Sequence, residues 1–599
     1  MNSGKGSCIR AVGFVLAAFL CQMANLQDLR CQALPDPPGS FMPVSATEVA
    51  SIPTWATGDR LVAAYYFYWY KWKDGCAGEL CDPAYNRSHI EFATGYLNSK
   101  KPLDALTSHP VDLKEWDFDN PAWHSTQIDR MLSAGIDILL PVFWGVPGRY
   151  GKDGHVVAAW SERGLKALAA ALDKREKEGK PNPRIGMFYD TSTLTFESPF
   201  NYQQGGKIDL KTEAGWKHFY ATIRDFYSLV PHRFWALWEK KPLVWLYASE
   251  FASGHDSHVL GYAREHFAQE FGGAVPLFIA HSDWSQEAGA DWIYQWGGAI
   301  KPTCLSINSV GPGFDNSAVH GLPRGSKVLR EREDSRFYRE AWEHALRSPA
   351  PITVVETWNE LHEGTEICPT VEYGDEYLRI TADYARAFKK GIAEPLPGPW
   401  RNAERASWTA RNGPQGIEAV QAEDGAFRTV ETREGNLIET IDSYLYFRVE
   451  DSFAFATRDR VKLEVEIFEV PTRPGQNRFG GTDAVHVEDD SWDLSAGYHG
   501  MYKSSESVAL SGRVGWKTVA FELPGARLAN NQNQSADFRL VVPKGPSRTQ
   551  VSKPVSPEAV IGTPAGRLPP RPANRKLLAE SDSHRRPLES RPRAVPPRH

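Results

Sequence analysis

The spacing of apolar and polar positions divides the chain into two regions. Between residues 60 and 390, short apolar runs alternate with longer amphipathic stretches, which is typical of strands and helices that alternate in a parallel sheet. The apolar runs predict eight strands, at Leu61–Tyr70, Ile136–Trp144, Arg184–Asp190, Pro242–Tyr247, Val275–His281, Asp291–Gln295, Thr303–Ile307 and Ile352–Thr357. Leu, Ala and Phe recur at three- and four-residue spacing in four predicted helices, at Ser161–Glu178, Glu213–Val230, Ser335–Arg347 and Asp375–Lys390.

Eight such units favour an α/β fold of the (β/α)8 TIM-barrel type. A doubly wound sheet is the alternative, but the chain has no GxGxxG after a first strand and nothing like a P-loop. After residue 414 the period becomes two, because apolar Val461, Leu463, Val465 and Ile467 alternate with charged residues. This pattern predicts an antiparallel β-sandwich, with further strands at Tyr444–Val449, Trp516–Leu523 and Asp537–Val542.

These patterns predict six segments along the chain. A segment after Pro543 is rich in Pro, Arg and Ser and poor in large apolar residues, which is typical of disorder. The predicted boundaries are a signal peptide at 1–33, a linker at 34–59, the barrel at 60–395, a linker at 396–414, a carbohydrate-binding-like β-sandwich at 415–543 and a disordered tail at 544–599.

Composition and charge exclude several classes of protein. The 599 residues exceed what one hydrophobic core holds, and a mean hydropathy of −0.44 excludes a polytopic membrane protein. The net charge is −6 and is unevenly distributed. After residue 543 there are twelve Lys and Arg against four Asp and Glu, which gives this tail a charge of +8 and the rest of the chain −14. Binding of phosphate backbones requires a dense basic surface, which the acidic part of the chain before residue 544 does not offer. Nucleic acid is therefore excluded as the main partner. The basic tail could contact an anionic cell surface.

The N-terminus indicates export. Lys5 and Arg10 precede an apolar run at 11–20, as in a secretory signal, which predicts a secreted or periplasmic protein. An uncleaved anchor is the alternative, although the run is shorter than the roughly 20 residues that a membrane span needs. Four cysteines remain after cleavage and permit two disulfides, one between Cys76 and Cys81 and one between Cys304 and Cys368. No CxxC accompanies them, so we expect no metal site.

The most informative stretch follows the eighth predicted strand and places Glu360 three residues before Glu363. In a barrel, catalytic groups stand at the carboxyl ends of the strands. Glycoside cleavage needs an acid to protonate the leaving oxygen and a second group at the anomeric centre, and two carboxylates supply both. The alternative is an ordinary acidic helix start. Aromatic residues that could stack on sugar rings also end strands, namely Tyr66, Trp69, Trp144 and Tyr189.

Five segments resemble the endo-α-mannosidase group of retaining glycosidases and its related barrel proteins. They are the YYFYWY run of the first strand, AGIDILLPVFWG, KPLVWLY, SVGPGF at Ser309–Phe314, and TWNELHEGTEICPTVEYGDEYL at Thr357–Leu378. The pattern from Gly515 to Arg539 resembles an accessory β-sandwich on uncharacterised bacterial members.

The resemblance implies a mechanism and roles for the two glutamates. Glu360 would act as base on the sugar 2-hydroxyl, which attacks its own anomeric carbon, and Glu363 would act as acid and then as base. Trp144 would stack on the sugar, with Tyr66 and Trp69 as neighbours. Further substrate-binding candidates at strand ends or beside the glutamates are Tyr189, Asp190, Asn359 and Arg330, with His281 and Asp283 as additional polar residues.

The chain departs from the family pattern at Leu361, at Cys368 and at Glu356, an extra carboxylate where a small polar residue is usual. A buried Glu356 would raise a neighbouring carboxyl pKa by repulsion and desolvation, or would accept hydrogen bonds from a backbone or Arg donor. We expect His362 to bond locally rather than to act as a base.

The sequence therefore predicts an exported glycoside hydrolase that acts on a polysaccharide or glycan, with no metal or organic cofactor. One alternative is a non-catalytic carbohydrate-binding or surface protein on the same barrel, since fold does not determine function. Another is a hydrolase of a different linkage that uses Glu356 or Asp190 as nucleophile.

Overall fold

The structure is a computed structural model of the chain. It describes residues 34–71, 106–146, 151–195, 207–319, 328–433, 435–440, 444–469, 484–510, 513, 515–542 and 561–562. The predicted signal peptide, Cys76, Cys81 and all of the predicted tail except 561–562 lie outside these residues. In the described part of the chain, no helix has both the length and the apolar character needed to span a bilayer.

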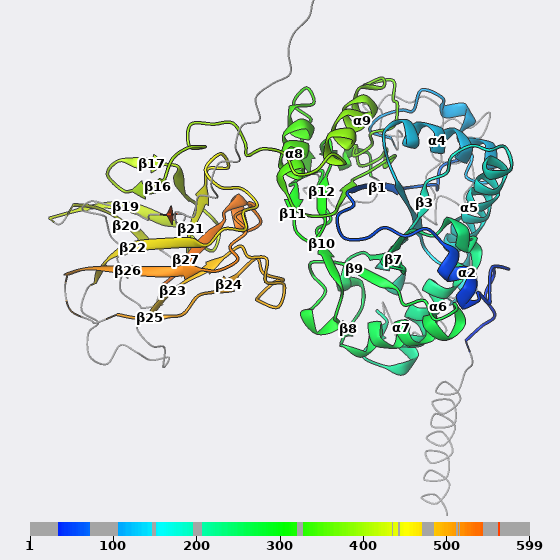
Figure 1. Ribbon diagram of the computed structural model, residues 1–599, viewed down its shortest axis with the longest axis horizontal. Coiled ribbons are helices and arrows are strands. Elements are labelled where there is room, and N and C mark those ends of the chain that lie inside the picture. The colour runs from blue at the N-terminus through cyan, green and yellow to red at the C-terminus, as the bar shows by residue number, and fades with distance from the viewer. Residues whose placement is uncertain are drawn as a thin grey trace, which may run out of the picture. The chain divides into compact units, whose positions relative to one another are not determined.

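Eight parallel strands form a nearly closed, barrel-like sheet (Figure 1). Its strands are β1 Leu61–Tyr66, β2 Ile138–Phe143, β4 Met187–Tyr189, β7 Lys241–Leu246, β9 Leu277–His281, β10 Trp292–Tyr294, β12 Asn308–Val310 and β15 Ile352–Val355. Their order is β10-β9-β7-β4-β2-β1-β15-β12, so the strands from β1 to β10 follow one another in chain order, and β15 lies between β1 and β12. Between the two ends of this order, Ile307 N donates to Ile293 O at 3.3 Å. A mixed α/β fold with a barrel-like parallel sheet was the expectation, and it is confirmed.

Helices lie outside the ring of strands (Figure 1). They are α4 Pro121–Ser133, α5 Gly151–Lys177, α6 Glu213–Leu229, α7 His258–Glu270, α8 Arg336–Arg347 and α9 Glu376–Phe388. The side chains of Asn120 and Thr212 cap the first turns of α4 and α6, which explains where these helices begin. The strands are buried on both faces, as in β1, β2 and β15, and therefore read as continuous apolar runs.

The seventh strand of the sheet differs from the prediction. Thr303–Cys304 forms β11, which runs antiparallel to β12, and the parallel strand is β12 at Asn308–Val310. The prediction missed β12 because it begins with two polar residues. Asn308 is nevertheless buried, and its Nδ2 donates to Thr353 Oγ1 on β15 at 3.1 Å. The partner strand thus accepts the amide hydrogen of a polar side chain that argued against a buried strand.

Shorter elements connect the main ones. They are α2 Ala46–Ser51, β3 Arg184–Ile185, β5 Asp209–Leu210, β6 Leu237–Trp238, β8 Gly254–His255, β13 Phe314–Asp315 and β14 Leu329–Arg330. Helix α2 lies inside the predicted linker 34–59. Isolated bridges pair Val44 with Phe271 and Trp55 with Trp238, so this linker is attached to the barrel-like region.

The C-terminal β-region contains two antiparallel sheets and a separate hairpin. One sheet has the order β17-β16-β28-β22-β26 and the other β18-β21-β27-β23-β24, with β25 beside β23. Their strands are β16 Arg405–Thr409, β17 Gly413–Gln415, β18 Ile417–Val420, β21 Tyr444–Val449, β22 Val461–Glu469, β23 Ala484–Asp489, β24 Lys503–Ser504, β25 Val508–Ala509, β26 Gly515–Leu523, β27 Phe538–Val541 and β28 Ile561–Gly562, and the hairpin is β19 Phe427–Thr432 with β20 Gly435–Thr440. Alternate residues of both sheets share one hydrophobic cluster, including Leu463, Val487 and Phe521.

Two boundary predictions are corrected here. Strand β16 begins at Arg405, inside the predicted linker 396–414. The prediction of disorder after Pro543 is wrong at Ile561–Gly562, because β28 pairs with β16 and β22. Open strand edges can order a short segment of otherwise polar sequence, since backbone hydrogen bonds do not depend on side-chain type.

The predicted disulfide between Cys304 and Cys368 is also wrong. Both cysteines are free and buried. Cys304 packs in a small cluster with Ala456 and Ala529, whereas Cys368 belongs to the large cluster of the barrel-like region. An even cysteine count permits a bridge, but only tertiary structure brings two sulfurs within bonding distance.

Candidate active site

The segment after β15 forms a closed turn that carries both glutamates. Thr357 N donates to Thr365 O at 2.7 Å, and Glu360 N donates to Thr357 Oγ1 at 2.7 Å. Gly364 has φ +61 and completes the turn in a backbone conformation that favours glycine. No helix begins here, so the interpretation of Glu360 and Glu363 as an acidic helix start does not hold.

Asn359 fastens this turn to the end of β1. Its Oδ1 accepts from Phe67 N at 2.8 Å, and its Nδ2 donates to Phe67 O at 2.6 Å. The side chain thus replaces a neighbouring strand for Phe67, the residue that follows β1. Because Asn359 is buried and both ends of its amide are occupied, it positions the turn rather than contacting a substrate.

Glu360 is almost fully buried, at 2% exposure, and is held by His362. Its Oε1 lies 2.8 Å from His362 Nε2. Tyr70 Oη accepts from Leu361 N at 3.0 Å and lies 3.4 Å from His362 Nδ1. A tyrosine proton shared with Nδ1 places the imidazole proton on Nε2, directed at Glu360. As expected, His362 bonds locally, and it orients one of the two candidate catalytic carboxylates.

Glu363 is partly exposed and its pKa is raised. Burial of the carboxyl is the main cause; nearby His362 opposes the rise and Asp190 adds to it. A carboxyl group that keeps its proton toward neutral pH can act as a general acid.

An aromatic wall joins the two glutamates to Asp190. Trp69 contacts the His362 ring at a centroid distance of 5.5 Å and meets Trp144 edge-on at 5.6 Å. Trp144 Nε1 donates to Asp190 Oδ2 at 2.5 Å, and burial raises the pKa of Asp190. The structure therefore brings together Glu360, Glu363, Trp69, Trp144 and Asp190, all of which the sequence predicted.

Glu356 is a buried acceptor that interacts electrostatically with Glu363. Its two carboxyl oxygens accept from Gly297 N and Gly298 N at distances between 2.7 and 2.9 Å. Burial raises the pKa of Glu356 to about 8, the two backbone donors oppose the rise, and the charge of Glu363 adds to it. The hypothesis that Glu356 accepts backbone hydrogen bonds is confirmed.

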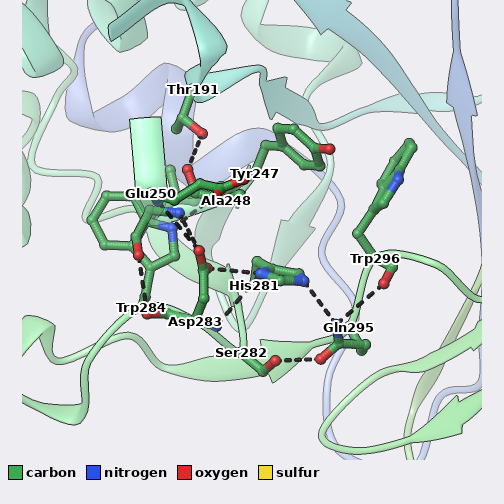
Figure 2. Close-up of polar contacts among 12 residues, drawn as sticks. Thr191, Tyr247, Ala248, Glu250, His281, Ser282, Asp283, Trp284, Gln295 and Trp296 are labelled. Carbon is green, nitrogen blue, oxygen red and sulfur yellow. Dashed lines mark hydrogen bonds and ion pairs between the residues drawn. The ribbon is translucent and has the colours of Figure 1, made fainter. Parts of the chain in front are cut away.

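A hydrogen-bond network extends the site along the ends of β9 and β10 (Figure 2). His281 lies between Asp283 and Gln295: its Nδ1 is 2.7 Å from Asp283 Oδ1, and its Nε2 is 3.0 Å from Gln295 Nε2. Because the carboxylate can only accept, Nδ1 carries the imidazole proton and Nε2 accepts from Gln295. Ser282 donates to Gln295 Oε1 and completes the chain.

This network holds two aromatic residues that sequence analysis did not select. Trp296 follows Gln295, and its ring packs on Tyr65, Phe188 and Tyr247 at centroid distances of 4.9, 5.5 and 5.3 Å. Tyr247 is partly exposed, and the charges of Asp190, Glu363 and Glu356 all act on its hydroxyl. Tyr247 ends the KPLVWLY run, so its place after β7 was the available signal.

Three predicted substrate-binding residues lie elsewhere. Tyr66 is fully buried on the outer face of β1, with its hydroxyl 2.9 Å from His124 Nδ1 of α4. Tyr189 packs on Phe219 of α6. Arg330 of β14 lies over the Phe337 ring, 4.1 Å from its centroid. Strand side chains alternate between faces, so Tyr65 and Phe188 face the interior in place of Tyr66 and Tyr189.

Arg332 is a further residue that the sequence did not reveal. It donates to Gly364 O at 2.9 Å and to Glu366 Oε1 at 2.6 Å, and both side chains are buried. The pair thereby anchors the C-terminal end of the turn that carries the glutamates. Among the residues that the structure describes, no three His, Cys, Asp or Glu side chains are arranged to bind a metal ion.

Known proteins resemble this chain in sequence and in fold. A family model described as a domain of unknown function (DUF5010) matches residues 92–395, just over half of the chain. The chain belongs to this family. The DUF5010 protein is also 30% identical over 111 residues to the "Glycoprotein endo-alpha-1,2-mannosidase-like protein" of Danio rerio, covering 15% of this chain and 25% of that one. It thus spans only a quarter of that relative's length. The match confirms the resemblance to the endo-α-mannosidase group.

Solved structures resemble the DUF5010 protein weakly. The GH99 endo-alpha-mannosidase from Bacteroides thetaiotaomicron, in complex with bis-tris propane, gives 19% identity and a TM-score of 0.38 over 55% of this chain and 98% of that one. A "Glycoside hydrolase-like protein" gives 14% identity and a TM-score of 0.37 over 56% and 96%. Likenesses at this level do not identify an activity.

Proposed function

We propose that the DUF5010 protein is an exported glycoside hydrolase, related to the endo-α-mannosidases, that cleaves a polysaccharide or glycan with retention. The observation that carries the proposal is the pairing of Glu360 and Glu363 on one turn beside Trp69 and Trp144. Two carboxylates next to flat aromatic faces meet the chemical needs of glycosidic cleavage. The same arrangement supports a (β/α)8 barrel with its site at the carboxyl ends of the strands.

The environments of the two glutamates support different roles. Glu363 is partly exposed and has a raised pKa, which suits a general acid that protonates the leaving oxygen and later activates water as a base. Glu360 is held by His362 at 2.8 Å, which fixes the direction of its carboxylate. We assign Glu360 the role of base on the sugar 2-hydroxyl, by analogy with the endo-α-mannosidase group.

A different nucleophile is less favoured by the contacts. Asp190 accepts from the Trp144 indole and from Ser192 N, and Glu356 accepts from two backbone donors. These hydrogen bonds favour positioning roles for both carboxylates. A non-catalytic carbohydrate-binding protein on the same fold is the second candidate, because the aromatic wall alone would also hold a sugar ring.

The test is a reducing-end release assay on a polysaccharide panel that includes α-mannans. Three proteins are compared: the wild type, Glu363→Gln, and Glu340→Gln, a matched control on the exposed face of α8. Loss of the proton donor should lower turnover by at least about 100-fold, the usual contribution of general acid catalysis. The Glu340 control should keep the wild-type rate.

Each result decides between the two candidates. Release by the wild type and the control alone supports hydrolysis with Glu363 as acid. Full activity in Glu363→Gln contradicts the assignment of that residue. If no protein releases sugar but all are retained by one polysaccharide, the binding-protein alternative is favoured. For an active enzyme, the anomeric configuration of the first product, followed by NMR, tests retention.

A further inference from the structure

A loop of the C-terminal β-region, residues 491–502, displays one tyrosine to solvent. Tyr498 is 69% exposed, more than any other large apolar or aromatic residue in the described part of the chain. The backbone around it is nevertheless well ordered by hydrogen bonds: Ser491 N donates to Gly500 O at 2.8 Å, and Met501 N donates to Tyr498 O at 3.2 Å. The exposed ring is therefore carried by a loop whose backbone is held by hydrogen bonds.

The backbone conformation at Tyr498 opposes its presence there. Tyr498 has φ +50 and His499 has φ +54, the left-handed region that disfavours residues with side chains. Glycine or asparagine would relieve the strain at both positions. Strained residues of this kind concentrate at ligand-binding sites, and here the strained residue carries an exposed aromatic ring.

Further aromatic rings continue from Tyr498 across the sheet. Tyr502 meets Tyr498 edge-on at a centroid distance of 5.6 Å. The Arg539 guanidinium then lies 4.2 Å from the Tyr502 ring and 3.7 Å from the Tyr444 ring. These four side chains form what we call the Tyr498 ladder. Asn533 borders it and bonds the Tyr502 hydroxyl at 3.1 Å.

Each cation at the Tyr498 ladder is paired with an acid, and Arg539 also lies 3.6 Å from a second one, Asp424. Arg539 bonds Glu488 Oε2 through Nε at 2.6 Å, and Lys503 lies 3.4 Å from Asp493. A polyanion would find no uncompensated cation among these residues. An aromatic face surrounded by neutralised polar groups suits a neutral pyranose ring, which offers an apolar face for stacking and hydroxyls for hydrogen bonds.

The same loop is bonded to the barrel-like region. His499 Nε2 donates to Trp284 O at 2.6 Å, and Gln286 Nε2 donates to Leu494 O at 2.8 Å. Trp284 in turn donates its indole N–H to Tyr247 O at 2.7 Å (Figure 2). One hydrogen-bonded chain thus connects the loop of Tyr498 to a residue of the candidate active site.

We propose that the Tyr498 ladder is a binding site for a neutral polysaccharide, in which one pyranose ring stacks on Tyr498. The site holds a polymer strand beside the segment that follows β9. Its role in supplying polymer to the glutamates rests on the proposed function, whereas binding by the ladder does not.

Affinity electrophoresis of the full chain tests this. All proteins carry Glu363→Gln so that the polymer stays intact, and the gels contain yeast α-mannan, starch or barley β-glucan. We compare that background with added Tyr498→Ala, Tyr498→Phe and Trp516→Ala. Trp516 is a matched control because it is an exposed aromatic residue outside the ladder. It packs on Phe468, and both residues belong to the sheet that does not contain Tyr444 and Arg539.

The expected result is retardation of the background protein in at least one gel. Tyr498→Ala should weaken this binding by about tenfold, the scale of one lost aromatic contact, while Tyr498→Phe and Trp516→Ala bind as the background does. Unchanged binding of Tyr498→Ala with an intact circular dichroism spectrum overturns the proposal, as does migration without retardation in all three gels. If Tyr498-dependent retardation occurs but the wild type releases no sugar, the proposed function alone fails.

Discussion

At the scale of residues, two effects raise the pKa of Glu363: burial of its carboxyl group and the charge of Asp190. Removing the Asp190 charge separates them. Burial raises that pKa, and the negative charge of Asp190 adds to the rise. Activity that needs protonated Glu363 is lost as pH rises through its pKa. Asp190→Asn removes the charge, so the alkaline limb of the kcat/KM profile should move to lower pH. Asp383→Asn, exposed on α9, is the control. A limb that moves up or stays in place would contradict the role of Asp190.

Glu356 couples protonation to folding. Its pKa is about 8 in the folded chain against an ordinary value of 4.5, because the carboxyl is buried. The folded state therefore holds a proton that the unfolded chain releases, and this contribution to stability is lost as pH rises from 4.5 to about 8. We expect the free energy of unfolding to fall less over this range in Glu356→Gln than in the wild type. Urea unfolding at both ends of the range checks this, and equal slopes would refute it.

At the scale of elements, the turn after β15 depends on one side chain that joins it to β1. Asn359→Ala leaves Phe67 N and Phe67 O buried without their partners. Each unmatched buried group costs about 1–3 kcal/mol, so the free energy of unfolding should fall by at least that amount. Asn412→Ala, at an exposed position, should change it by no more than about 0.5 kcal/mol. Equal urea midpoints for the two variants would show that the hydrogen bonds between Asn359 and Phe67 do not stabilise the fold.

At the scale of the whole molecule, Cys304 and Cys368 belong to separate hydrophobic clusters and remain thiols. Burial raises the pKa of the Cys304 thiol to about 12, so it should react slowly in the folded protein. After denaturation without reductant, iodoacetamide should alkylate both residues to the extent seen in a reduced control. A cross-linked peptide containing both cysteines, found by mass spectrometry, would contradict the structure.

The sequence by itself determined the class of fold and selected the two candidate glutamates. Strands buried on both faces are continuous apolar runs, so seven of the eight predicted strands coincide with the parallel strands of the sheet. Glu360 and Glu363 stood out because a short motif after the last strand places two carboxylates within one turn. Strand burial and the spacing of two carboxylates in one turn are both local properties, so the local sequence pattern is enough to predict them.

Only the tertiary structure decided which side chains share the site. Neighbouring aromatics of a strand point to opposite faces, so register alone places Tyr65 inside and Tyr66 against α4. Strand β12 was hidden because it begins with Asn308, a polar residue that is buried and bonds Thr353 of β15. The partners of Glu356 come from about sixty residues earlier in the chain. Contacts between segments far apart leave no periodic trace in the sequence, which is why these residues emerged from the structure alone.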